Sequence, residues 1–283
     1  KSNVLYKGEH AAIKIAPTVT SSTVELNNSK IQLGANNQVG FYNEGGSCNF
    51  TMEGSEISVI EGKALSGVKA ILAIGAAGAA YNINNATLSV SNNFHYAIWI
   101  KSPEQHFVIN NSEVYGWSAF YMQGAWYSSD GADGMTLKAS HSTFTGVGKE
   151  GSSNGFGVIV FEGTERSVVE MDNCTITNKI IGNTKDYGFV PPIVFQKGGG
   201  TGGTQRPCMK PSADCSVSLK SCTLQNMAEA TTSVFVSYEN VLEKESNGYL
   251  DYNRNIVSID PSTRFLNADG SNCLLYTSDA ADE

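Results

Sequence analysis

The chain has 283 residues, a formal net charge of −8 and only four arginines, and this mildly acidic balance argues against nucleic-acid binding. No stretch approaches the ~18 apolar residues of a membrane helix, so we expect no direct membrane insertion. Charged residues make up 16% of the chain and glycine is abundant at 29 residues, a composition typical of short strands joined by polar turns.

A short pattern recurs along the chain. Its first copy begins with two alternating apolar residues, Val24 and Leu26, continues through a polar pair to the small residue Ser29, and ends at the apolar Ile31. Copies span residues 24–31, 50–57, 81–88, 107–114, 137–144, 169–176 and 217–224. A weaker copy begins at Val257, and Arg264 breaks its last apolar position. Alternation places the apolar pair on one face of a strand, and the polar pair predicts a tight turn.

A second apolar strand is predicted a dozen or more residues before each copy. These strands cover residues 12–15, 39–41, 71–74, 97–100, 119–122, 158–161, 192–195 and 234–236. Each repeat therefore reads as strand, loop, strand, turn, strand. One such coil cannot bury its apolar side alone, so we expect the coils to stack. The prediction is an all-β, single-domain solenoid of about eight coils over residues 1–272, truncated at both ends.

Stacking predicts columns of equivalent residues along the rod. The small residue of each copy falls at Ser29, Ser55, Ala86, Ser112, Ser142, Cys174 and Cys222. We expect Cys174 and Cys222 to be buried members of this column rather than reactive thiols. The turn residues Asn28, Asn85, Asn111 and Asn173 are expected to form an asparagine ladder, with side-chain amides bonding along the rod.

The turn motif and its asparagines resemble the pectin-lyase-like right-handed parallel β-helix superfamily over residues 9–270. This resemblance implies a right-handed β-helix. The superfamily includes pectate and pectin lyases, polygalacturonases, phage tailspikes, autotransporter passenger domains and pectate-lyase-like adhesive domains, and the chain is closest in character to the last. Fold resemblance alone does not select among these functions.

The catalytic motifs of the enzymes in that superfamily are not found. There is no WIDH-like segment, and the NTD, DD, GHG and RIK strings of polygalacturonases do not occur. Arg166 has Glu162 and Glu165 nearby, but a solvated charge cluster explains them. We therefore assign no catalytic residue.

An aromatic segment over residues 94–127 contains all three tryptophans, and an acidic loop follows it. Sugar rings stack on aromatic faces and bond to nearby carboxylates, so this segment is the candidate glycan site. Its candidate residues are Trp126, Tyr127, Asp130, Asp133, Trp117 and Tyr121. No cofactor is expected, although Asp130 and Asp133 are weak candidates for calcium. The alternative is that these aromatics are ordinary packing residues and the loop is a simple turn.

Three further features concern processing and export. Cys208 and Cys215 close a glycine-rich insertion and are a possible disulfide in an exported protein. Residues 273–283 resemble translated sequencing-adapter read-through, so we treat them as a probable non-native tail and the chain as a metagenomic fragment. The chain begins at Lys1, so the lack of a signal peptide carries no weight.

We expect a non-catalytic β-helix module of a bacterial secreted or cell-surface protein, adhesin-like, in contact with a polysaccharide or a glycoprotein glycan. One alternative is a fragment of a polysaccharide lyase or glycoside hydrolase acting on acidic polysaccharide. The other is a purely structural stalk.

Overall fold

The computed structural model describes residues 3–6, 11–75, 77–90, 96–124, 131–147, 157–179, 191–196, 212–227, 235–238 and 255–273. All elements in these ranges are β-strands. Within the same ranges, no helix is long and apolar enough to cross a membrane.

The strands form three parallel sheets, which we call sheets A, B and C. Sheet A consists of β1 (Asn3–Tyr6), β4 (Lys30–Leu33), β7 (Glu56–Val59), β10 (Thr87–Ser89), β13 (Glu113–Gly116), β16 (Thr143–Gly146), β19 (Thr175–Asn178), β22 (Thr223–Asn226) and β25 (Arg264–Leu266). Sheet B consists of β2 (Ala11–Ile15), β5 (Val39–Asn43), β8 (Lys69–Ala73), β11 (Tyr96–Ile100), β14 (Ser118–Gln123), β17 (Ile159–Glu162), β20 (Ile193–Gln196) and β23 (Val236–Tyr238). Sheet C consists of β3 (Ser21–Asn27), β6 (Ser47–Glu53), β9 (Ala80–Asn84), β12 (His106–Asn110), β15 (Thr136–Ser140), β18 (Val168–Asp172), β21 (Ser216–Lys220) and β24 (Ile256–Ile259).

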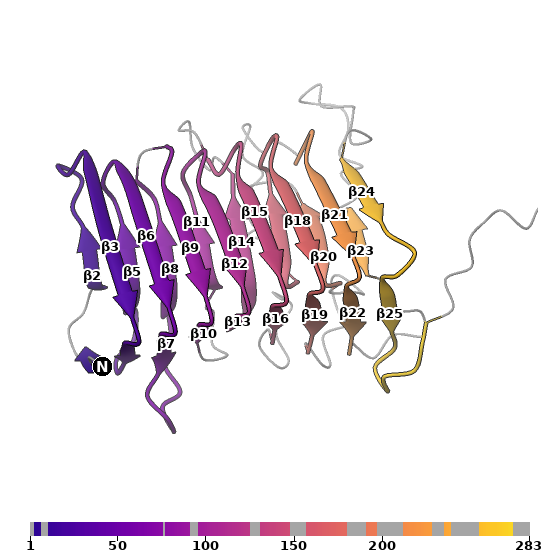
Figure 1. Cartoon of the computed structure of the whole chain (residues 1–283), viewed down its shortest axis with the longest axis horizontal. Coiled ribbons are helices and arrows are strands. Elements are labelled where there is room, and N and C mark those ends of the chain that lie inside the picture. Colours follow the sequence, from indigo (N-terminus) through magenta and orange to yellow (C-terminus); the bar gives the residue numbers. More distant parts are fainter. Residues whose placement is uncertain are drawn as a thin grey trace, which may run out of the picture.

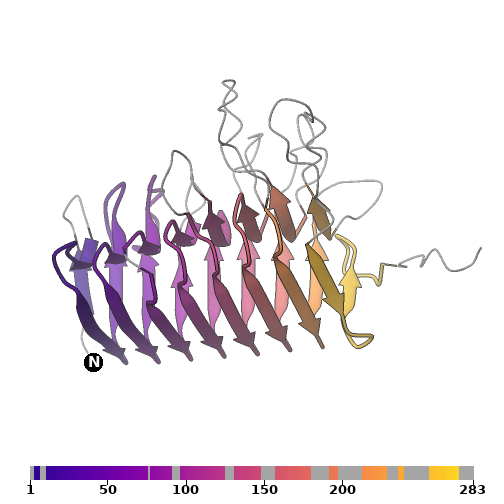
Figure 2. The same cartoon turned by 90° about the horizontal axis from the view of Figure 1, so that it is seen from above.

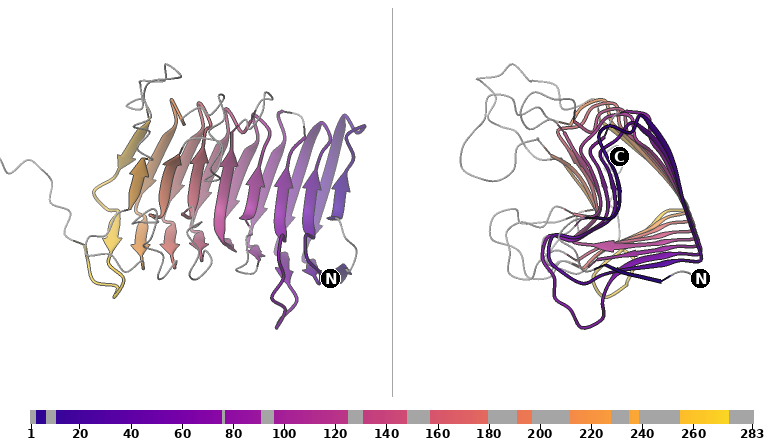
Figure 3. Two further views of the ribbon diagram at one scale, coloured as in Figure 1. Left: turned by 180° about the vertical axis from the view of Figure 1, so that it is seen from behind. Right: turned by 90° about the vertical axis from the view of Figure 1, so that its left-hand side faces the viewer.

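Each sheet takes every third strand of the chain, so the chain winds around a single axis. The strand order follows the sequence along the rod (Figure 1, and Figure 2 from above). The view along the axis shows the sheets as the sides of one column (Figure 3). The predicted fold class, an all-β right-handed parallel β-helix, is confirmed.

Alternation in the strands builds the core. In β12, Phe107 and Ile109 are buried in the core. Their neighbours along the strand face outward: His106 is exposed and Val108 is partly exposed. Parallel register places Phe107 between Tyr81 and Leu137 of the neighbouring coils, so apolar side chains stack in continuous columns. The apolar face of each coil is covered by the coils on either side, as the repeat predicts.

Of the four asparagines predicted to form a ladder, Asn85 bonds along the rod, with its amide donating to Glu53 Oε1 of the neighbouring coil (2.7 Å). Asn28, Asn85, Asn111 and Asn173 adopt the left-handed conformation, with φ of 46°, 50°, 47° and 51°. Gly54, His141 and Ser221 occupy the same position in other coils and share that conformation. A left-handed residue is what turns the chain between sheets C and A, and asparagine tolerates that conformation better than most residues.

Side chains of the residue before the turn asparagine also bond from coil to coil. The Asn110 amide donates to Asn84 Oδ1 (3.0 Å), and Ser140 Oγ donates to Asn110 Oδ1 (2.7 Å). Farther along the rod the same position carries an ion pair between Lys220 and Asp172 (3.0 Å). The last strand residue before the turn points outward beside its neighbours, so it contributes most of the side-chain bonds that run along the rod at this turn.

The column of small residues is confirmed. Ser112 Oγ accepts a hydrogen bond from the Ala86 N–H (3.1 Å) and donates to the Asn110 carbonyl (2.7 Å). Ser142 Oγ repeats this pattern for the Ser112 N–H (3.1 Å). Each hydroxyl thus satisfies the backbone of two adjacent coils, which explains why a small residue is needed there.

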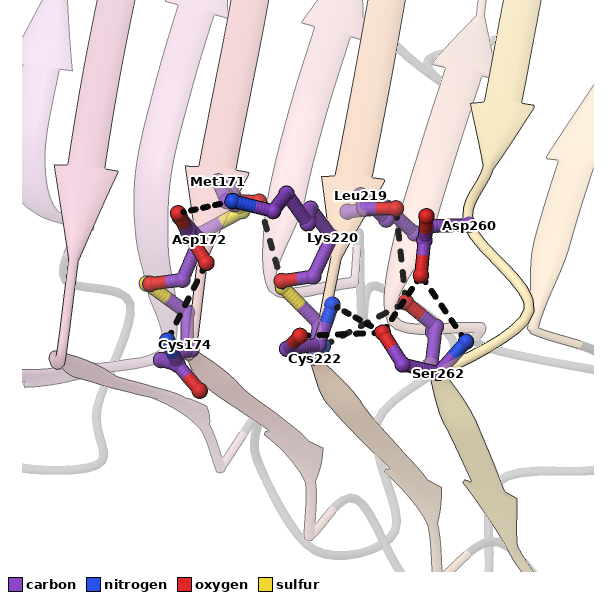
Figure 4. Close-up of polar contacts among 11 residues, drawn as sticks. Met171, Asp172, Cys174, Leu219, Lys220, Cys222, Asp260 and Ser262 are labelled. Atoms are coloured by element: carbon purple, nitrogen blue, oxygen red, sulfur yellow. Dashed lines mark hydrogen bonds and ion pairs between the residues drawn. The ribbon is translucent and has the colours of Figure 1, made fainter.

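Cys174 and Cys222 take the same place on neighbouring coils (Figure 4). Both are 1% exposed, as predicted, and Cys222 Sγ donates to the carbonyl of Lys220 (3.3 Å) as the serine hydroxyls do. A hydrogen bond to Cys222, together with burial, raises the pKa of the Cys174 thiol. These cysteines therefore act as ladder residues.

The last coil departs from the repeat by one residue. The spacing of the repeat from Val257 predicts Ser262 at the small-residue position and Arg264 at the apolar position. Instead, Thr263 Oγ1 accepts from the Cys222 N–H (3.3 Å), and Phe265 pairs with Leu224. The turn at Asp260 is one residue longer, so an aromatic residue fills the core position after all.

Substitution of Asn111 tests the left-handed turn. Asn111→Gly is expected to leave the free energy of unfolding within about 0.5 kcal/mol of wild type, because glycine adopts φ of 47° freely. Asn111→Val is expected to cost about 1–2 kcal/mol, because a β-branched residue is strained there. Urea unfolding followed by circular dichroism measures both, and equal stabilities of the two variants would contradict the assignment.

Candidate functional site

The structure describes half of the predicted glycan site. Trp126, Tyr127 and Asp130 lie outside the described residues, so their role stays a prediction. Trp117, Tyr121 and Asp133 are described, and they do not lie together as one set. Trp117 directly precedes β14 of sheet B and Tyr121 lies within β14, whereas Asp133 lies in the turn before β15.

Trp117 and Tyr121 belong to an aromatic cluster with Tyr96 and Trp99. Within β11, Ile98 and Ile100 are fully buried in the core, so Trp99 between them points to the outer face of sheet B. Register pairs Trp99 with Leu72 of the preceding coil and Tyr121 of the next. The cluster therefore forms because two consecutive coils bring β11 and β14 side by side on one face.

The rings of the cluster pack closely. Tyr96 stacks on Tyr121 with centroids 4.0 Å apart and planes 9° apart. Trp99 meets Tyr96 edge-on at 5.0 Å, and Trp117 lies 5.4 Å from Tyr96. Trp117 and Tyr121 are only 1% and 2% exposed, whereas Trp99 is partly exposed. Trp99 and Tyr96 are both partly exposed, and the buried rings of Trp117 and Tyr121 pack against them.

Polar groups fix the cluster from the next two coils. Trp99 Nε1 donates to Gln123 Oε1 (3.1 Å), and the Tyr121 hydroxyl donates to the Glu162 carboxylate. Gln123 and Glu162 are register partners on β14 and β17. Glu162 is fully buried, and its charge, after burial itself, raises the pKa of Tyr96. The indole orientation is thus set by hydrogen bonding as well as by packing.

Two lysines lie over the Trp99 ring. The Lys101 ammonium is 4.0 Å from the ring centroid, and the Lys69 ammonium is 5.0 Å from it. Lys69 Nζ also donates to the Gly67 carbonyl (2.7 Å). Burial lowers the pKa of Lys69 to about 8, with a further contribution from the positive charge of Lys101. The outer face of sheet B therefore combines an indole with two closely placed cations.

Of the two predicted calcium ligands, Asp133 is described, and its carboxylate takes part in a hydrogen bond between coils. Asp133 Oδ1 accepts a hydrogen bond from the Glu165 N–H (2.8 Å), which ties one coil to the next. Among the described residues, no group of three or more His, Cys, Asp or Glu side chains is placed to hold a metal ion. Asp130 is not described, so a calcium site there stays a prediction.

Of the two cysteines in the predicted disulfide, the structure describes only Cys215. Cys215 is a buried free thiol whose Sγ lies 3.3 Å from the carbonyl oxygens of Thr164 and Ala213. Burial raises its pKa to about 12. Cys208 lies outside the described residues, so a bond between the two cysteines stays a prediction.

Sequence reasoning missed three members of this site, namely the partly exposed Trp99 and Lys69 and the exposed Lys101. A signal for Trp99 was present, because an aromatic residue between two core isoleucines must face outward. Lys69 carried no such signal, because it lies on the preceding coil and only the register brings it near Trp99, whereas Lys101 lies two residues after Trp99.

Comparisons with known proteins add the following. No family model matches the chain, and no curated protein matches it. Among solved structures it is similar to the mannuronan C-5 epimerase AlgE4 A-module of Azotobacter vinelandii, with a TM-score of 0.41 and 12% identity over 94% of this chain and 85% of that one. A likeness at this level says nothing about the activity of this chain.

Proposed function

We propose that the protein is a non-catalytic, adhesin-like β-helix module of a secreted or cell-surface bacterial protein, and that it binds a polysaccharide or glycoprotein glycan on the outer face of sheet B. The observation that carries this proposal is the partly exposed Trp99 ring, held by Gln123 and backed by three further aromatic rings.

The geometry suits a sugar ring. An indole offers a flat apolar surface for the C–H face of a pyranose, and polar groups at its edge bond the hydroxyls. Tyr96 and Gln123 fix the ring before a ligand arrives, so little side-chain freedom is lost on binding. The exposed Lys101 does not block the ring, because an exposed cation–π contact is worth only about 0.5–1 kcal/mol and the lysine stem is flexible.

Binding to a long glycan is expected to be weak at each contact and strengthened by repetition. A rod with regularly spaced coils presents one flank to an extended polymer, and several such modules on a cell surface would bind it together. This mode requires no catalytic group.

Trp99→Ala is the test. We expect glycan-array or affinity-electrophoresis binding to fall by about ten-fold or more, since a central aromatic anchor is removed. Val108→Ala, on the outer face of sheet C, is the matched control and is expected to bind as wild type. Trp126→Ala, in the predicted loop, is examined in parallel. Trp99→Phe, which keeps an aromatic ring, is a second variant. Binding at the wild-type level by folded Trp99→Ala protein would refute the proposal that glycans bind on the outer face of sheet B.

A lyase-type enzyme is the second candidate, and one observation favours it. Tyr121 and the buried Glu162 share a hydrogen bond beside Lys101, so acid–base groups do gather near Trp99. Formation of unsaturated products from an acidic polysaccharide, with or without calcium, would support this candidate. Binding without turnover supports the module, and absence of both leaves the structural stalk.

A further inference from the structure

Cys174 and Cys222 lie one coil apart, at the same position of the turn between sheets C and A (Figure 4). The residues that follow them, Thr175 and Thr223, are register partners, and the Thr223 N–H donates to the Cys174 carbonyl (2.8 Å). Neighbouring strands of a sheet lie about 4.8 Å apart, and the Cα atoms of disulfide-bonded cysteines lie about 4.4–6.8 Å apart. The spacing of the coils therefore allows a disulfide between these two residues.

The two sulfur atoms lie within reach of each other. Cys222 Sγ is 3.4 Å from the carbonyl oxygen of Met171, which belongs to the coil of Cys174, so this sulfur extends back across the gap between the coils. The thiols of Cys174 and Cys222 share a hydrogen bond. Formation of a bond between the sulfurs therefore needs side-chain rotation within the turn, and no distant segment has to move.

Cysteine is not the residue that the small-residue column itself requires. Other coils have serine at this position, and the hydroxyls of Ser112 and Ser142 bond the backbones of two adjacent coils. A thiol is a weaker hydrogen-bond donor and acceptor than a hydroxyl. Two cysteines on adjacent coils therefore give up hydrogen bonding that serine would provide, and what they gain as a pair is the ability to form a covalent bond.

The coil that separates the two cysteines is long. The register partners Asp172 and Lys220 on either side of it are 48 residues apart, whereas Ser112 and Ser142 on adjacent coils are 30 apart. Closing a longer segment costs more chain entropy, and a cross-link removes that freedom from the unfolded chain. A covalent bond here is therefore expected to stabilise the rod more than the same bond across a shorter coil.

The hydrogen bond between the thiols gives them different reactivities. The contact with Cys174 lowers the pKa of the Cys222 thiol, and the same contact, together with burial, raises the pKa of the Cys174 thiol. A thiolate is the form that attacks an oxidant. Cys222 is therefore the nucleophile, and Cys174 is the thiol that reacts with the oxidised intermediate.

We propose that Cys174 and Cys222 are a redox site, whose thiols join in a disulfide between adjacent coils when a small peroxide oxidises the protein. The Cys222 thiolate attacks one peroxide oxygen, the O–O bond breaks, and a sulfenic acid and hydroxide form. The hydroxide takes up the proton that Cys222 released. The Cys174 thiol then attacks the sulfenic sulfur, the S–O bond breaks, and the hydroxyl leaves with the thiol proton as water.

The reaction balances and adds to the role of the column. Two thiols and one hydrogen peroxide give one disulfide and two water molecules, so the sulfurs are oxidised and the peroxide is reduced. In the reduced protein both cysteines serve as column residues, and oxidation adds a covalent bond between their coils. The site lies at the turn between sheets C and A, so it does not depend on the proposed function at sheet B.

Peptide mapping tests the site, because trypsin separates its two cysteines. Cys174 is the only cysteine of residues 167–179, and Cys222 is the only cysteine of residues 221–244. The full chain is treated with one equivalent of hydrogen peroxide, both folded and during refolding from urea, and is then alkylated and digested without reductant. We expect a linked pair of these peptides, lighter by two hydrogen atoms than the separate peptides and lost with dithiothreitol. We also expect the Tm to rise on the order of 5 °C.

Serine variants identify the two roles. Cys174→Ser and Cys222→Ser are each expected to abolish the linked peptide and the rise in Tm, and to fold as wild type because serine fits this column in other coils. Cys174→Ser keeps the nucleophile, so dimedone is expected to trap a sulfenic acid at Cys222. Cys222→Ser is expected to give no such product at Cys174. Cys48→Ser, which removes another buried thiol, is the matched control and is expected to keep the linked peptide.

Two results would overturn the inference. One is recovery of Cys174 and Cys222 as separate alkylated peptides after both treatments. The other is a product in which either of them is joined to a different cysteine or to a second chain, which a non-reducing gel detects. A bond between Cys208 and Cys215 stays within residues 198–220, so the mapping distinguishes it from this site.

Discussion

Replacing Phe107 with alanine is expected to lower the free energy of unfolding by about 3–5 kcal/mol. Phe107 is fully buried at the centre of the rod. It stacks on Tyr81 with centroids 4.2 Å apart and planes 3° apart, and it meets Phe120 edge-on at 5.1 Å. Removing the ring leaves a cavity between coils, and neighbours held by the sheet hydrogen bonds cannot collapse to fill it.

Urea unfolding followed by circular dichroism measures this loss. Phe107→Leu keeps most of the volume and is expected to cost less than half as much. Val108→Ala, the adjacent residue facing outward, is expected to change stability by about 0.5 kcal/mol at most. A loss for Phe107→Ala no larger than that for Val108→Ala would mean that the aromatic column does not hold the coils together.

Much of the fold was predictable because a β-helix is built from repeated local rules. The alternation at Phe107 and Ile109 gives the inward face, and its recurrence identifies the coils. The column from Ser29 to Cys222 followed from the same repeat. These features depend on a few adjacent residues, so one sequence contains them.

The details of the turns were less predictable. A run of two asparagines such as Asn110 and Asn111 does not say which one bends the chain and which one bonds along the rod. The answer depends on backbone conformation, with the second residue left-handed and the first extended. The extra residue before Thr263 was hidden for a similar reason, because Ser262 is also small.

The candidate site was the least predictable part. Sequence reasoning pointed to the aromatic segment that contains Trp99 but favoured residues of the following loop and two rings, Trp117 and Tyr121, that are buried. What makes the face is contact across coils: Lys69 reaches Trp99, and Trp99 reaches Gln123, over gaps of about 24 to 30 residues. Such contacts depend on loop lengths and register, which a single repeat pattern does not determine.

Gly124 connects the stability of the rod to this face. Its N–H donates to the Glu162 carbonyl of the next coil (2.5 Å), and it directly follows Gln123, the partner of Trp99. A Cβ placed on Gly124 would lie 2.1 Å from the Gly163 carbonyl oxygen and 2.6 Å from that of Glu162. Both obstacles are backbone atoms, so the two coils would have to separate.

Gly124→Ala is therefore expected to cost about 3 kcal/mol or more, at or beyond the upper end of overpacking effects. It is also expected to weaken glycan binding, because Gln123 and Glu162 would move away from Trp99 and Tyr121. Gly62→Ala is the matched control: its φ is +74° but nothing lies within 4 Å of the added methyl group, so only the backbone cost of about 1–2 kcal/mol is expected. If urea unfolding finds Gly124→Ala no less stable than Gly62→Ala, the coils are not in the close contact described, and the link between coil packing and the Trp99 face is lost.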